Sequence, residues 1–141
     1  MKIGFVLPVI SDYLSAMAST RLRCFDIIRM FKYDILYKLE IFDENNKYDL
    51  VIFQKSFRRE HYELALKMKE KNTRVLLDIN VNYIEANDSN EFISWDQIED
   101  IKKMVSISDY ILTSSTKLKE IYSRYHKSVF CIEELVTDNF F

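Results

Sequence analysis

The chain alternates between short continuous apolar runs and longer segments whose apolar residues recur three and four positions apart. The short runs lie at 2–7, 48–53, 74–78, 109–113 and 128–132. Val75, Leu76 and Leu77 show no alternation with polar residues, which is typical of a strand covered on both faces in a parallel sheet. Pro8 ends the first run, because proline donates no hydrogen bond to a neighbouring strand. The runs therefore predict strands.

The segments between these runs predict amphipathic helices. Residues 18–31 carry an apolar stripe and would be capped by Ser19 or Thr20, and Ser56 would cap a helix that ends near residue 71. Ser94 and Gln97 have the spacing of a capping box, which predicts the start of another helix. Its buried face would use Trp95, Ile98, Ile101 and Val105. A last helix would contain Leu118, Ile121, Tyr122 and Tyr125.

Residues 33–41 are the ambiguous segment. Tyrosine, isoleucine and leucine alternate there with charged residues, which favours a half-exposed strand near the sheet edge, although an amphipathic helix also fits. Strands that alternate with helices predict a parallel sheet with right-handed crossovers. We therefore expect an α/β fold, a Rossmann-like three-layer domain with a mainly parallel sheet of about six strands.

Composition limits the classes of function. The 141 residues are the size of one domain, and 48% hydrophobic with 30% charged residues is ordinary for a globular protein. A net charge of −2 offers no basic field for nucleic acid, and no apolar run approaches the length of a membrane span. Cys24 and Cys131 lack metal-ligand spacing, so we expect two reduced, buried thiols in a cytoplasmic protein.

Polar residues that directly follow the predicted strands are the candidate site, since ligands of open α/β sheets gather at the carboxyl ends of the strands. Asp78, Asn80 and Asn82 follow one strand. Arg21 and Arg23 would lie in the first turn of a helix, where cations oppose the helix dipole. Either an ion pair or an anion held at this edge explains that placement, and both readings stay open.

Three more residues follow predicted strands. Lys55 is either a cleft residue or a plain surface lysine. Ser114 and Ser115 stand where a strand turns into a helix, so helix capping explains at least one of them without any ligand. No metal-ligand cluster, glycine-rich dinucleotide motif or P-loop occurs, and we assign no metal and no cofactor.

Several segments resemble, in the right order, the amino-terminal domain of GT-B glycosyltransferases of the group 1 type. They are MKIGFVLP, ASTRLRCFDIIRMF, YDLVIFQK, TRVLLDIN, SDYILTSSTKLKEIY and SVFCIEELVTDNFF. The resemblance implies a Rossmann-like acceptor-side domain at 1–134, with 135–141 starting the connection to a second domain absent from this chain. That second domain would hold most of the nucleotide-sugar site, so this chain alone should not transfer sugar.

The resemblance also implies roles for individual residues. Asp78 matches the position of a catalytic base, which would deprotonate an acceptor hydroxyl. The other matching positions would bind substrate: Arg21, Arg23, Lys55, Asn80, Asn82, Ser114 and Ser115. The family's glycine pair after the first strand is missing here. The implied partners are a nucleotide-sugar donor, a glycan acceptor and, because many members build cell-surface glycans, the inner face of a membrane.

Two other readings remain. A receiver or flavodoxin-like binding domain shares this architecture, but a receiver needs acidic residues after the first and third strands, and this chain has Pro8 and Gln54-Lys55 there. The second is a non-catalytic interaction module, such as a half-enzyme completed by another chain. Exposed Phe140 and Phe141 would favour that module.

Overall fold

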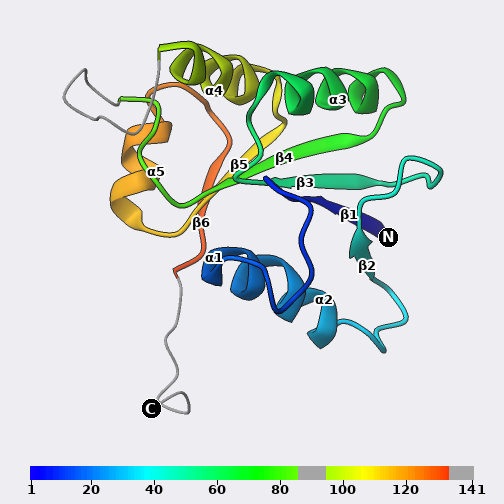
Figure 1. Cartoon of the computed structure of the whole chain (residues 1–141). Helices are drawn as coiled ribbons and strands as arrows, with labels where there is room; N and C mark the ends of the chain where they lie inside the picture. The colour runs from blue at the N-terminus through cyan, green and yellow to red at the C-terminus, as the bar shows by residue number, and fades with distance from the viewer. Residues whose placement is uncertain (86–94, 134–141) are drawn as a thin grey trace, which may run out of the picture.

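The chain folds as a single parallel sheet flanked by helices (Figure 1). The computed structural model describes residues 1–85 and 95–133. Its strands are β1 (Lys2–Val6), β2 (Lys38–Ile41), β3 (Leu50–Gln54), β4 (Arg74–Ile79), β5 (Tyr110–Thr113) and β6 (Val129–Cys131). They lie in the order β2-β1-β3-β4-β5-β6, and every neighbouring pair is parallel. The predicted α/β three-layer fold is confirmed.

The strand order decides which face each helix covers. The helices are α1 (Ala18–Thr20), η1 (Arg21–Phe25), α2 (Asp26–Met30), α3 (Arg59–Glu70), α4 (Trp95–Ile107) and α5 (Thr116–Tyr122). From β1 to β2 the chain moves one way across the sheet, and from β3 to β6 it moves the other way. Right-handed crossovers therefore place the continuous α1–η1–α2 unit on one face and α3, α4 and α5 on the other.

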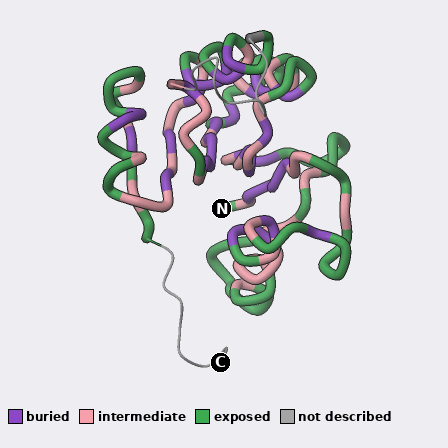
Figure 2. The backbone as a smooth tube through the Cα atoms, turned by 60° about the vertical axis from the view of Figure 1, so that its left-hand side comes forward, coloured by how far each residue is buried: buried purple, intermediate pink, exposed green. Residues whose placement is uncertain are grey.

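Two apolar cores follow from this arrangement (Figure 2). The larger core lies between the sheet and α3, α4 and α5, and includes Phe53, Leu77, Ile101 and Tyr122. The smaller core lies between β1 and the α1–η1–α2 unit and is built on Ile3, Phe5 and Cys24, with partly buried residues of β2 and β3 around them. The buried Ile98, Ile101 and Val105 confirm the predicted inner face of α4, while the side chain of Trp95 lies outside the described part.

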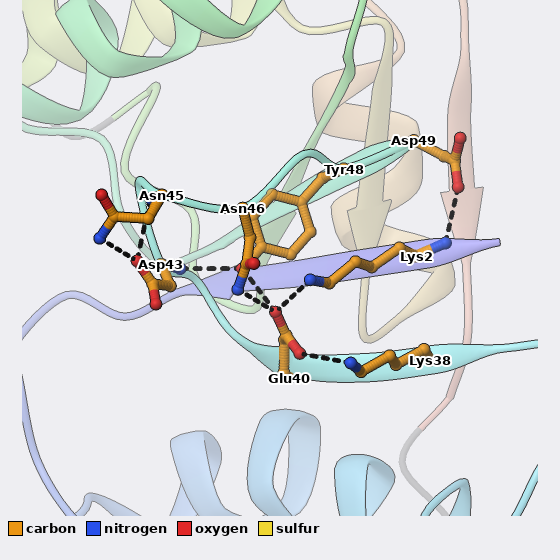
Figure 3. A network of polar contacts seen from close by, with 8 residues as sticks. All are labelled: Lys2, Lys38, Glu40, Asp43, Asn45, Asn46, Tyr48 and Asp49. Atoms are coloured by element: carbon orange, nitrogen blue, oxygen red, sulfur yellow. Dashed lines mark hydrogen bonds and ion pairs between the residues drawn. The ribbon is translucent and has the colours of Figure 1, made fainter.

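A loop rather than a helix crosses from β2 to β3, and it depends on the single glycine of the chain. The loop passes over β1, and an added Cβ on Gly4 would lie 2.9 Å from Cε1 of the Tyr48 ring. Figure 3 shows how this ring is held: the Tyr48 hydroxyl accepts from the amide of Asp43 and donates to Glu40, both at 2.9 Å. Gly4 therefore provides the room that the crossing needs.

Glu40 joins this crossing to the neighbouring strands (Figure 3). Its carboxylate lies 2.9 Å from the ammonium of Lys2 and accepts a hydrogen bond from the side-chain amide of Asn46. Lys2 also lies over the Tyr48 ring, 5.0 Å from its centre. Burial alone would raise the pKa of Glu40, but the hydrogen bonds from Lys2 and Tyr48, together with the charges of Lys2 and Lys38, outweigh burial and lower it.

Two local predictions were wrong, and a third was right only in part. The side chains of Ser19 and Thr20 do not cap the first helix, whose N-cap residue is Met17. Ser56 does not cap α3 either, because its hydroxyl donates to the carbonyls of Val6 and Gln54 inside the fold. The half-exposed strand predicted near the sheet edge is confirmed at Lys38–Ile41, which form the edge strand β2, whereas 33–37 form an exposed turn.

The remaining expectations concern the capping box, the terminal aromatic pair, the cysteines and membrane crossing. Ser94 of the predicted capping box and the aromatic pair Phe140 and Phe141 lie outside the described residues. Both cysteines are free thiols, as expected, but only Cys24 is fully buried, while Cys131 is half-buried. Among the helices of the described residues, none combines the length and the apolar character that crossing a membrane requires.

Candidate functional site

The carboxyl edge of the sheet brings the predicted site residues to one side of the molecule. Because all six strands are parallel, the residues that follow β1, β3, β4 and β5 leave the sheet at the same edge. The strand order reverses between β1 and β3, and such a switch point is where open α/β sheets bind ligands. This edge is therefore the candidate site.

A buried ion pair lies under this edge. The guanidinium of Arg23, from η1, donates through both Nε and Nη2 to the carboxylate of Asp78 at the end of β4; the Nε distances are 2.9 and 3.1 Å. Both side chains are almost wholly buried, at 8% and 3% exposed. Two charges removed from water need such a bidentate arrangement to offset their desolvation. Of the two readings of Arg23, the structure supports the tertiary ion pair.

The helix that carries Arg23 has an unusual local form. Residues 21–25 make a π-turn, in which the amide of Asp26 donates to the carbonyl of Arg21, five residues earlier. Such turns are rare and occur frequently at functional sites. Arg21, at the start of this turn, donates from Nη1 to the carbonyl of Ala16 at 3.1 Å, within the loop after β1. The two arginines therefore have different environments despite their closeness in sequence.

Sequence reasoning missed a second buried contact beside the pair. The Thr20 hydroxyl donates to Oε1 of Gln54 at 2.9 Å, and both residues are buried. Nε2 of Gln54 and Oδ1 of Asn80 are buried without a hydrogen-bond partner among the described residues. Gln54 lies directly opposite Asp78 in the β3–β4 pairing. Its position as the first polar residue after an apolar run was the available signal.

Lys55 leaves β3 with a left-handed backbone. Its φ is 50°, a conformation that is uncommon for a residue with a side chain. The amide of Lys55 donates to the carbonyl of Asp78 at 2.8 Å, which ties the ends of β3 and β4 together. The backbone of the half-buried Lys55 therefore contacts the backbone of Asp78, a member of the buried pair.

The other candidates border this edge, and two of them, Asn82 and Ser115, have local hydrogen-bonding roles. Asn82 accepts from the amide of Glu85 through Oδ1, which closes a turn after β4. Ser115 is the N-cap of α5, where its hydroxyl accepts from the amide of Leu118. Helix capping thus accounts for Ser115, as the sequence suggested. Ser114 precedes it and is half-buried, and Asn80 is also half-buried.

A small cleft opens beside the ion pair. It has a volume of about 240 Å³ and is lined by the pair together with Leu22, Ile27, Leu112, Ile132 and Glu133. A wider hollow of about 1100 Å³ lies at the opposite, amino edge, around Asn45, Lys71 and Tyr110. None of the predicted site residues lines that wider hollow. We therefore place the candidate site at the carboxyl edge, despite the smaller volume there.

The described residues offer little for metal or thiol chemistry. No group of three or more histidine, cysteine, aspartate or glutamate side chains within residues 1–85 and 95–133 is arranged to hold a metal ion. Burial raises the pKa of the Cys24 thiol to about 12, and the nearby Asp78 carboxylate adds to this. A thiol with so high a pKa is not a nucleophile at neutral pH.

Comparisons with known proteins add no name to this site. The family models, the curated proteins and the solved structures with which the chain was compared gave no match.

Proposed function

We propose that this chain is the acceptor-side domain of a glycosyltransferase that uses a nucleotide-sugar donor. The observation that carries the proposal is the edge where Lys55, Asn80, Asn82 and Ser114 follow three adjacent parallel strands. Amide and hydroxyl side chains both donate and accept hydrogen bonds, which suits the hydroxyls of a glycan. The resemblance of segments across the chain to group 1 GT-B enzymes supports the same function.

In this proposal the buried pair positions the site, and the neutral side chains contact the acceptor. Arg23 and Asp78 hold the π-turn against the end of β4. A catalytic role for Asp78 stays a prediction, and it requires that ligand binding or a second domain release a carboxylate oxygen from Arg23. We propose that the natural enzyme has a second domain and that this domain binds the donor. The chain alone should therefore transfer no sugar. Sugar turnover by the purified chain would contradict that division.

Titration of the ¹⁵N-labelled chain with oligosaccharides, followed by NMR, tests the acceptor role. We expect the amide signals of Lys55, Asn80 and Ser114 to shift with saccharide and to stay in place with nucleotide alone. Asn80→Ala should weaken saccharide binding at least fivefold, because its amide is part of the proposed contact. Asn45→Ala is the matched control, since Asn45 is exposed in the loop before β3. A saccharide panel without any shift at this edge would contradict the proposal.

A second candidate function is a flavodoxin-like binding domain for a small ligand. The order β2-β1-β3-β4-β5 is the flavodoxin order, with the switch point at β1 and β3. Receiver chemistry has no support, because Gln54 and Lys55 stand where the phosphate-accepting aspartate would follow β3. FMN therefore belongs in the same titration. Edge shifts with FMN and none with saccharides would favour this second candidate.

A further inference from the structure

One face of the sheet is covered unevenly. Three crossovers place α3, α4 and α5 on one face, whereas the single α1–η1–α2 unit lies on the other and packs on β1, β2 and β3 (Figure 1). No helix among residues 1–85 and 95–133 has its core residues packed on β4, β5 and β6 on that second face. All-parallel sheets occur almost only with both faces covered.

The side chains of β4, β5 and β6 show the same asymmetry. On the face toward α3, α4 and α5, Val75, Leu77 and Ile111 are fully buried. On the opposite face, Leu76, Tyr110 and Leu112 are only half-buried, and Phe130 and Ile132 are 54% and 63% exposed. We call these five residues the open half-face. The rings of Tyr110 and Phe130 contact each other across it, 6.1 Å between centres.

We propose that the open half-face is a docking site for one amphipathic α-helix of a partner polypeptide, running antiparallel to the strands. A helix about 10 Å across fits a face of three strands spaced about 4.8 Å apart. The six residues of β4 set the length of the docked helix. Because a strand rises about 3.3 Å per residue and a helix about 1.5 Å, about 13 helical residues would span this strand. Helices connecting parallel strands run in this direction, and residues 1–85 and 95–133 place no such helix on this half-face.

The charge at the carboxyl end of the open half-face sets the direction of the helix. Exposed Glu133 lies there, beside the cleft. At the amino end the charge of Arg74 acts on the carboxylate of Asp109, so that end favours neither pole of a helix. A helix antiparallel to the strands places its positive N-terminal end near Glu133.

The cleft between Leu22, Ile27 and Leu112 is where the helix would lie against the α1–η1–α2 unit. At about 240 Å³, it falls below the roughly 300 Å³ at which pockets for whole small ligands begin. Its walls are mostly apolar, which suits an inserted leucine or phenylalanine side chain of the docked helix. A helix docked here would share this cleft with the edge proposed for the acceptor, but the inference itself rests on the exposed apolar side chains and not on glycan chemistry.

The test uses a synthetic library of 14-residue helical peptides with apolar residues at i, i+3, i+4 and i+7, selected against the full chain. We expect selected peptides to bind with micromolar Kd and to shift the NMR amide signals of Leu76, Leu112 and Phe130. Phe130→Lys should weaken binding at least tenfold, and Glu133→Lys about two- to fivefold, because lysine would face the positive helix end. Ile35→Lys is the matched control: Ile35 is 97% exposed in the turn before β2, so binding should not change.

Three results would overturn the proposal. The first is a library without any peptide that binds below 1 mM, and the second is selected peptides that bind Phe130→Lys and Ile35→Lys equally. The third is concentration-dependent dimerisation, in sedimentation, that Phe130→Lys abolishes, because the face would then belong to a second copy of this chain. Circular dichroism of each variant shows whether it is folded before binding is compared.

Discussion

At the Arg23–Asp78 pair, two opposite charges lie almost wholly out of water. The carboxylate accepts hydrogen bonds from Nε and Nη2 of one guanidinium, and the pair links η1 to the end of β4. Attraction inside a protein is strong, but so is the cost of removing each charge from water. Loss of one partner therefore costs more than the pair contributes, since the other charge stays buried and unpaired.

Asp78→Asn should lower the free energy of unfolding by about 3 kcal/mol, because Arg23 would keep its charge without a carboxylate. Urea denaturation at pH 7 measures this. Glu63→Gln is the matched control, since the Arg59–Glu63 pair is largely exposed, and breaking it should cost less than about 0.5 kcal/mol. Equal losses in the two variants would show that the buried pair has no special role in stability.

Gly4 is a second position where one residue matters. Gly4→Ala should lower the free energy of unfolding by about 1–3 kcal/mol, because the new methyl group would overlap the buried Tyr48 ring. In a protein that already carries Tyr48→Ala, the Gly4→Ala change should hardly lower the free energy of unfolding further, since the overlapping ring is gone. Thermal unfolding of the four proteins provides the cycle, and additive losses would contradict the steric explanation.

At the scale of elements, Asp109 joins three of them at the amino edge. Asp109 directly precedes β5. Its carboxylate lies 2.7 Å from the ammonium of Lys69 on α3 and accepts from the amide of Val75 in β4 at 2.8 Å. Burial alone would raise the pKa of Asp109. The hydrogen bonds from Lys69 and Val75, together with the charges of Lys69 and Arg74, outweigh burial and lower the pKa below its ordinary value of 3.8.

A lowered pKa means that the ionised Asp109 stabilises the folded state. This contribution is present above pH 3.8, the ordinary value, and is lost as the pH falls through the lowered pKa of the folded state. Asp109→Asn should therefore cost about 1 kcal/mol at pH 7 and less at pH 2.5. Denaturation series at the two pH values measure the difference. A cost that does not change with pH would exclude ionisation of Asp109 as its cause.

At the scale of the whole molecule, one helical unit of the described residues covers the second face of the sheet. Cys24 belongs to this unit, packs against the sheet and is fully buried, and burial raises the pKa of its thiol to about 12. A thiol reagent should therefore modify Cys24 only when the α1–η1–α2 unit opens or the protein unfolds. In Cys131→Ser, modification by an excess of Ellman's reagent at pH 8 should be slow and should accelerate with urea. Rapid modification in native buffer would contradict this packing.

Much of the fold was predictable from sequence because its signals are local. Continuous apolar runs identified the strands, and apolar residues at three- and four-residue spacing identified the inner faces of the helices. The prediction for 33–41 was right at Lys38–Ile41 and wrong at 33–37. The alternation at 33–37 is real, yet Asp34 accepts from the amides of Leu36 and Tyr37 and turns the chain instead. A local hydrogen bond of this kind leaves no periodic signal.

The sequence by itself determined the succession of strands and helices, and the polar residues that follow each strand. Both features depend on the periodicity of the backbone and on the chemistry of single side chains, and a short stretch of sequence is enough to recognise them. Only the tertiary structure decided that Asp78 pairs with Arg23, that Gln54 is buried beside it, and that three strands carry an open half-face. Pairing across 55 residues and the distribution of helices over two faces follow from strand order, which a periodic pattern does not contain.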